Sequence, residues 1–147
     1  MKNIRFIGFV MAVSLLTALL TIPAAAHEGR EVGDYEIELG WLVEPAYTTL
    51  LNGAELTITN HKTDTPVEGA EDTLKLEVRF GPSSKILKLR SIPNEPGHYS
   101  ADLIPTQPGD YIFQVTGTIG DTPVDETFSA TDGQFSSVDP ISDIQFP

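Results

Sequence analysis

Short runs in which apolar and polar residues alternate constrain the fold of this chain more than any other feature of its sequence. The run from Gly33 to Trp41 alternates: every second residue from Tyr35 is apolar, and the residues on the other face are acidic or glycine. Because successive side chains of a strand point to opposite faces, this period of two predicts a strand with one buried face. The same pattern, weakest in the last run, predicts further strands over 54–58, 74–80, 85–90, 99–103, 111–115 and 122–128.

Clusters of glycine, proline, asparagine and aspartate separate these runs at intervals of roughly ten residues. They lie at 52–53, 64–66, 81–82, 93–97, 105–109 and 120–121. Such residues fix or free the backbone where a strand has to end. No segment after Ala26 carries the 3.6-residue apolar repeat of a helix. The sequence therefore predicts an all-β fold, an immunoglobulin-like antiparallel sandwich of about seven strands, with a small barrel as the alternative.

Residues 1–26 are typical of a helical signal peptide. Lys2 and Arg5 supply a positive start, an apolar stretch follows, and three alanines ending at Ala26 supply small residues at a cleavage site. We expect cleavage after Ala26, which makes the protein secreted, periplasmic or otherwise extracytoplasmic, with no membrane span afterwards. The alternative is a retained anchor, but the apolar run is shorter than the ~20 residues that a spanning helix needs.

The remaining chain divides into three parts. Residues 27–32 form a mature N-terminal segment, 33–130 the sandwich, and 131–147 an acidic C-terminal tail. The tail keeps apolar residues among its Asp, Ser and Gly residues, namely Phe135, Val138, Ile141, Ile144 and Phe146. Two interpretations of these apolar residues are open: the tail packs against the sandwich, or it docks a partner.

Composition excludes several classes of function. A net charge of −12 makes a nucleic-acid partner unfavourable, because phosphate binding needs a basic surface. Without cysteine there are no disulfides, thiolate metal ligands or cysteine nucleophiles. Both methionines precede Ala26, so the processed chain also lacks a sulfur ligand for Cu(I). No nucleophile elbow, P-loop or dinucleotide motif is present. We therefore expect no enzyme, no catalytic residues and no cofactor other than a metal.

Three histidines are the candidate metal ligands: His27, His61 and His98. After cleavage, His27 would become the new N-terminus and would offer both its amine and its imidazole to one ion. A second histidine would complete a three-nitrogen copper(II) site. The alternative is that His27 merely follows the leader and that the other two are solvated turn residues.

The aromatic residues allow one further hypothesis, a sugar-binding or hydrolytic domain with an exposed aromatic strip. Its members would be Trp41, Tyr47, Tyr99 and Tyr111. The alternation instead places Trp41, Tyr99 and Tyr111 on the inward faces of their strands, which favours the core. The segment around Tyr111, 108–113, also resembles the tyrosine corner of immunoglobulin-type sandwiches, in which the hydroxyl bonds back to the backbone.

Two glycine–x–tyrosine segments, 97–99 and 109–111, each have a proline just before the glycine. Together with 52–58 and the turn at 65–70, they resemble the YtkA-like and FixH-like exported domains. This resemblance implies an immunoglobulin-like sandwich linked to copper handling or oxidase assembly. A fainter likeness is to the CopC copper-resistance proteins, which share a mature N-terminal histidine, here His27. The comparable hairpin at 121–124 lacks their histidine.

The functional hypothesis is an exported, non-enzymatic, immunoglobulin-like binding or accessory module of the cell envelope. Its partner would be an envelope protein or a metal ion. The alternative is a periplasmic copper(II)-binding protein of copper handling or oxidase assembly that uses the mature N-terminal histidine.

Overall fold

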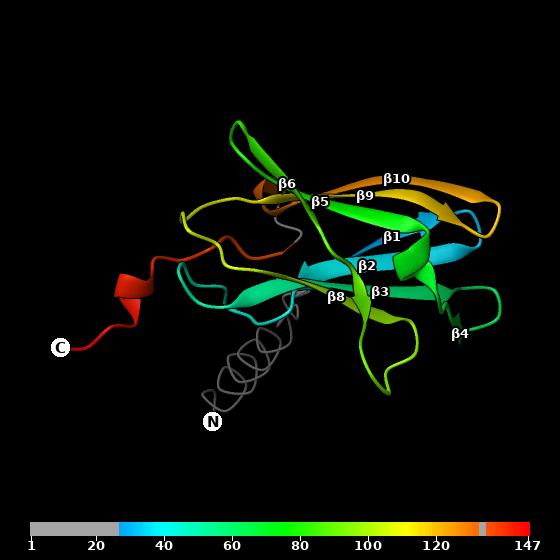
Figure 1. Cartoon of the computed structure of the whole chain (residues 1–147), viewed down its shortest axis with the longest axis horizontal. Helices are drawn as coiled ribbons and strands as arrows, with labels where there is room; N and C mark the ends of the chain where they lie inside the picture. The colour runs from blue at the N-terminus through cyan, green and yellow to red at the C-terminus, as the bar shows by residue number, and fades with distance from the viewer. Residues whose placement is uncertain (1–26, 133–134) are drawn as a thin grey trace, which may run out of the picture.

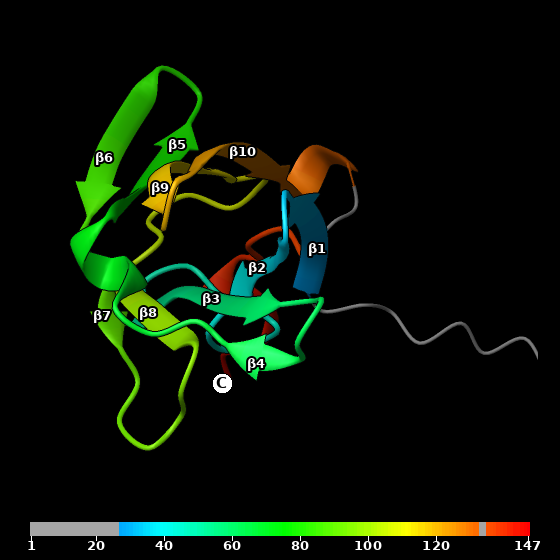
Figure 2. The same ribbon diagram turned by 90° about the vertical axis from the view of Figure 1, so that its right-hand side faces the viewer.

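The computed structural model describes residues 27–132 and 135–147, which form two facing antiparallel sheets (Figures 1 and 2). The six-stranded sheet has the order β1 (His27–Val32), β2 (Tyr35–Trp41), β3 (Asn52–Asn60), β8 (His98–Leu103), β7 (Arg90–Ser91), with β4 (Thr65–Pro66) paired to β3. The four-stranded sheet has the order β10 (Thr122–Ser129), β9 (Ile112–Ile119), β5 (Leu74–Phe80), β6 (Ser83–Leu87). Three single-turn 3₁₀ segments complete the described elements: Ala70–Asp72, Ala130–Asp132 and Ile141–Asp143.

The predicted antiparallel sandwich is confirmed. The described residues contain ten strands where about seven were expected, and the short β4 forms within the turn predicted at 64–66. The run 85–90 is not one strand, because the chain crosses from β6 in one sheet to β7 in the other. A further strand, β1, precedes the first predicted strand. Its residues do not alternate between apolar and polar, so no periodicity predicts this strand. Backbone hydrogen bonds to β2 form it.

The expected signal peptide lies outside the described residues, and no helix within them has the length and apolar character that crossing a bilayer requires.

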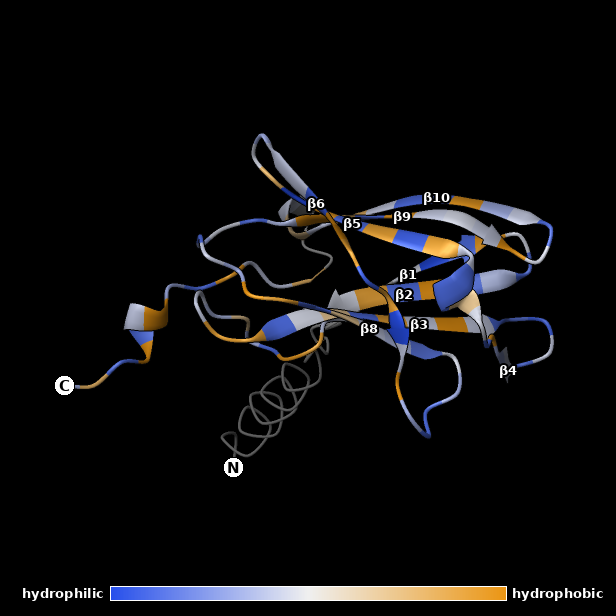
Figure 3. Ribbon diagram, viewed as in Figure 1, coloured by the Kyte–Doolittle hydropathy of each residue, from blue (hydrophilic) through white to orange (hydrophobic). Residues whose placement is uncertain are grey.

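The core lies between the sheets and is made by the inward residues of the alternating runs. Figure 3 shows apolar and polar residues alternating along β2, β3 and β5. Trp41 is 1% exposed, and its ring meets those of Tyr111 and Phe113 edge-on, with centroids 5.5 and 5.3 Å away. Edge-to-face aromatic pairs add to the stabilisation that burial supplies. The inward faces predicted from the alternation are thus the buried ones.

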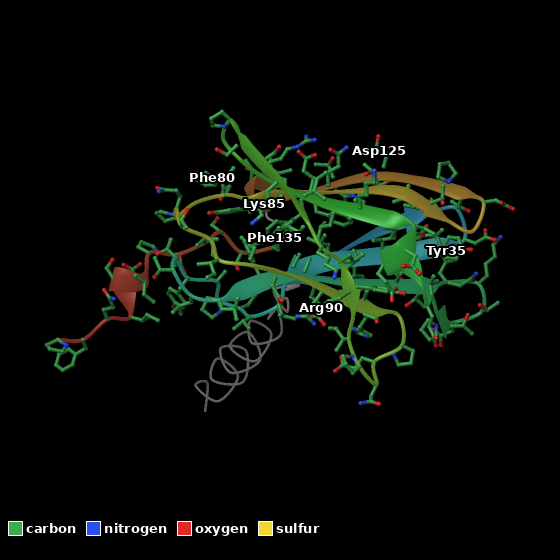
Figure 4. The ribbon with its side chains drawn as sticks, in the orientation of Figure 1. Tyr35, Phe80, Lys85, Arg90, Asp125 and Phe135 are labelled. Atoms are coloured by element: carbon green, nitrogen blue, oxygen red, sulfur yellow. The ribbon has the colours of Figure 1, made fainter. Side chains whose placement is uncertain are left out.

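The C-terminal tail contributes a third aromatic partner to Trp41. Phe135, labelled in Figure 4, is 4% exposed. Its ring centroid lies 6.1 Å from that of Trp41. The Trp41 Nε1–H donates to the Ser136 carbonyl at 2.8 Å, and Val138 exchanges two backbone hydrogen bonds with Gly109. Ile144 and Phe146, in contrast, are 54% and 97% exposed. The first part of the tail therefore packs against the sandwich, and its end is exposed.

The tyrosine-corner geometry expected at Tyr111 is present. Its hydroxyl donates to the Gln107 carbonyl at 3.1 Å, and its ring lies 4.7 Å from that of Phe80. We expect Tyr111→Phe to keep the ring contacts and lose this bond, which lowers the free energy of unfolding by about 1 kcal/mol. Urea denaturation followed by circular dichroism measures this difference. An unchanged midpoint and slope would show that the hydroxyl does not stabilise the fold.

Candidate functional site

The three histidines lie in different parts of the six-stranded sheet and its loops. The backbone of His27 is opposite Gly40 at the start of β1, and its side chain lies outside the described residues. His61 is exposed in the turn after β3, where its N–H donates to the Asp34 carbonyl at 3.0 Å. His98 begins β8 opposite Thr57. β1 and β8 are three strand spacings apart, about 14 Å across the sheet, so the sheet does not bring the three histidines together.

His98 has acidic neighbours that the sequence analysis did not single out. Its Nδ1 atom lies 3.6 Å from Glu55 Oε1 and 3.2 Å from Thr57 Oγ1. Donor atoms of Glu55, Glu95 and His98 all lie within 4.8 Å of one another. Glu55 and His98 are half-buried, whereas Glu95 is exposed. Imidazole nitrogen and carboxylate oxygen are both donors to divalent metal ions, so this cluster is a candidate metal centre.

Two structural devices assemble this cluster. β3 and β8 pair in a register that sets Thr57 opposite His98, and this side of the sheet faces away from the core. The turn between β7 and β8 then folds back, with the His98 N–H donating to the Glu95 carbonyl at 3.1 Å. Gly97 makes this turn possible: it has a φ of +78°, and an added Cβ would stand 2.8 Å from the Ile58 carbonyl oxygen. The alternation placed Glu55 on a polar face, but no sequence signal indicated its partner strand.

A shallow cavity of about 290 Å³ lies beside Glu95. Glu68 and Glu71 also line it, so its wall is acidic. Tyr99 closes one side, and its hydroxyl donates to the Val67 carbonyl at 2.5 Å. Burial raises the pKa of Tyr99 above its ordinary value of 10, and the nearby carboxylates of Glu71 and Glu68 raise it further. Tyr99 is therefore a neutral hydrogen-bond donor, and its bond to Val67 stabilises the fold.

A second cavity, of about 220 Å³, opens between the β5–β6 hairpin and the loop after β8. Its lining includes Phe80 and Lys85, which Figure 4 labels on the same side of the sandwich, together with Ile104, Pro105 and Tyr111. Carboxylates are absent from the residues that line it. Its wall is thus more apolar than that of the cavity beside Glu95.

Exposed apolar side chains gather at one end of the sandwich. Three segments meet there: 42–51, 104–110 and 135–147, which we call the loop end (Figure 1). Thr49 N–H donates to the Pro105 carbonyl at 2.8 Å, and Asp139 N–H donates to the Ala46 carbonyl at 2.8 Å. The loop end carries these exposed apolar residues: Val43, Leu50, Leu51, Ile104, Ile144 and Phe146. Its charged residues are all acidic: Glu44, Asp110, Asp139 and Asp143.

The exposed fractions of the aromatic side chains test the proposed sugar-binding strip. Trp41 and Tyr99 are each 1% exposed, and Tyr111 is 6% exposed. The interpretation of these three as core residues is confirmed, and none of them offers an open face to a sugar ring.

Comparison with known proteins identifies the fold and no further property. No family model matches the chain, and no curated protein matches it. Among solved structures, it is similar to a DUF4426 family protein from Pseudomonas aeruginosa PAO1, with 15% sequence identity and a TM-score of 0.50. The match covers 71% of this chain and 90% of that chain. The resemblance to the YtkA-like, FixH-like and CopC proteins therefore stays a prediction.

Proposed function

We propose that the chain is an exported, non-enzymatic binding or accessory module of the cell envelope, and that it holds a protein partner at the loop end. One observation carries this proposal. Seven large apolar residues are exposed in the described chain, and all except Ile86 lie in the loop end. Exposed apolar surface costs free energy in water, so the concentration of these side chains at one end of the molecule supports an interaction site there.

The charge of the loop end indicates what kind of partner surface would complement it. The loop end combines its apolar side chains with four acidic residues and contains no lysine or arginine. A partner surface with an apolar centre and a basic rim complements it, and such complementarity guides specific association. The net charge of −12 disfavours an anionic surface such as a nucleic acid or an acidic membrane.

Copper handling or oxidase assembly, which the YtkA-like and FixH-like resemblance implies, is a specific form of this accessory role.

Copper(II) binding by the mature N-terminal His27 is the second candidate function. The register supports it in one respect: Gly40 lies opposite both His27 and Glu55, and a glycine places no side chain between those two positions. Titration of the chain from His27 onward with CuCl₂ tests this candidate, which predicts weaker copper(II) binding in the His27→Ala variant.

Site-specific photo-crosslinking in the native envelope tests the partner surface. A photoreactive phenylalanine analogue at Leu51, which is 71% exposed, is expected to give one discrete adduct. The matched control is the same analogue at Ile86, which is 66% exposed but lies on β6 outside the loop end. Asp143→Lys should lower the adduct yield severalfold, because the partner's rim is basic. No adduct at Leu51, or equal adducts at both positions, would refute the proposal.

A further inference from the structure

The donor atoms around His98 have nearly the spacing that a metal ion requires. Two ligands of a tetrahedral ion with bonds of about 2.1 Å stand about 3.4 Å apart. The separation of His98 Nδ1 and Glu55 Oε1 is 3.6 Å. Glu95 lies within 4.8 Å of both and is carried on an exposed turn, so a side-chain movement of about 1 Å completes a three-donor set.

An independent observation comes from Ser100. This residue is 1% exposed, and its Oγ atom has no hydrogen-bond partner among the described residues. It lies opposite Glu55 in the β3–β8 register and two residues after His98, so its side chain is on the same face as theirs. A buried hydroxyl without a partner is costly, and native proteins pair nearly all such groups. An ion at this face, or a water molecule bound to it, would supply the partner.

The surrounding charge favours a cation. Glu68 and Glu71 line the cavity that Glu95 borders, so further carboxylates share that cavity with one of the three donors. Arg90, which lies opposite Ser100, directs its guanidinium to Asp102 Oδ1 at 2.7 Å. Coulombic attraction to these carboxylates is strongest for a divalent ion.

We propose that His98, Glu55 and Glu95 form a binding site for a divalent first-row transition ion such as Zn²⁺, with the Ser100 hydroxyl as a further oxygen contact. One imidazole and two carboxylates suit such an ion better than Cu(I), which prefers sulfur. The site lies on the outer face of the six-stranded sheet and not in the loop end. Its failure would therefore leave the proposed partner surface intact.

Calorimetric titration with ZnCl₂ tests the site, using the chain from His27 onward, which contains every strand of the described fold. We expect one Zn²⁺ site that persists in His27→Ala, a variant that removes the imidazole of a terminal chelate. His98→Ala and Glu95→Gln should each weaken binding at least tenfold, because each removes one of three protein donors. Thermal melting without metal checks that these surface variants remain folded.

The matched controls are His61→Ala, an exposed histidine in a turn, and Glu38→Gln, an exposed carboxylate of the same sheet. Both should bind Zn²⁺ within twofold of the parent. If His98→Ala binds as the parent does, or if His61→Ala is weakened equally, the site is refuted. Loss of Zn²⁺ binding in His27→Ala alone would also refute it and would place the ion at the N-terminal histidine instead.

Ser100→Ala separates a structural hydroxyl from a ligand-binding one. Because Ser100 Oγ has no partner in the described fold, its removal should leave the metal-free melting temperature unchanged or higher. The same variant should bind Zn²⁺ severalfold more weakly. Parent-like affinity in Ser100→Ala would overturn the assignment of this hydroxyl to the ion.

Discussion

Trp41→Ala is expected to lower the free energy of unfolding by about 3–5 kcal/mol, the range for deleting a large buried aromatic side chain. The ring is 1% exposed and contacts Tyr111, Phe113 and Phe135. Its indole N–H also satisfies the Ser136 carbonyl. One substitution therefore removes contacts from β2 to the opposite, four-stranded sheet and to the C-terminal tail. Because whole domains are stable by only about 5–15 kcal/mol, the variant should lose a large share of its stability.

The measurement is urea denaturation followed by far-ultraviolet circular dichroism, since Trp41 is the only tryptophan and its fluorescence disappears with it. Val43→Ala is the matched control, because Val43 lies two residues away but is 56% exposed. It should change the free energy of unfolding by less than about 0.5 kcal/mol. A loss below about 1 kcal/mol in Trp41→Ala would contradict the packing described for this ring.

Ending the chain after Thr131 should be about as damaging, costing about 4–6 kcal/mol from the loss of two buried apolar side chains. These are Phe135, 4% exposed, and Val138, 2% exposed. Their removal opens one end of the core and leaves the Trp41 indole N–H and the Gly109 backbone without their tail partners. We therefore expect the shortened protein to melt at a much lower temperature and to bind hydrophobic dyes.

A shorter deletion provides the control for this truncation. Ending the chain after Asp143 removes only 144–147, which includes the exposed Ile144 and Phe146. Its melting temperature should match that of the full chain within about 2 °C, because surface residues contribute little to stability. Equal melting temperatures for both truncations would show that the packed part of the tail does not stabilise the sandwich.

The candidate metal cluster shows where sequence reasoning ends. His98 was identified as a possible ligand from its residue type, and the alternation placed Glu55 on a polar strand face. Their contact depends on the pairing of β3 with β8, which joins residues about 40 positions apart, as in the Thr57–His98 hydrogen bond. Glu95 joins them only because the turn closes over Gly97. Strand partners are chosen by the packing of the whole domain, and one strand's periodicity contains no information about its neighbour.

The amino-acid sequence by itself determined the longer alternating strands β2, β3, β5, β8, β9 and β10, the burial of Trp41, Tyr99 and Tyr111, and the corner at Tyr111. These features follow from local rules, because a half-buried strand must alternate and a turn needs particular residues. Only the tertiary structure decided that β1 joins the sheet, that the chain changes sheets between β6 and β7, and that Phe135 fills the core. Each of these depends on surfaces and backbone groups contributed by distant segments, and such long-range complementarity exists only once the chain has folded.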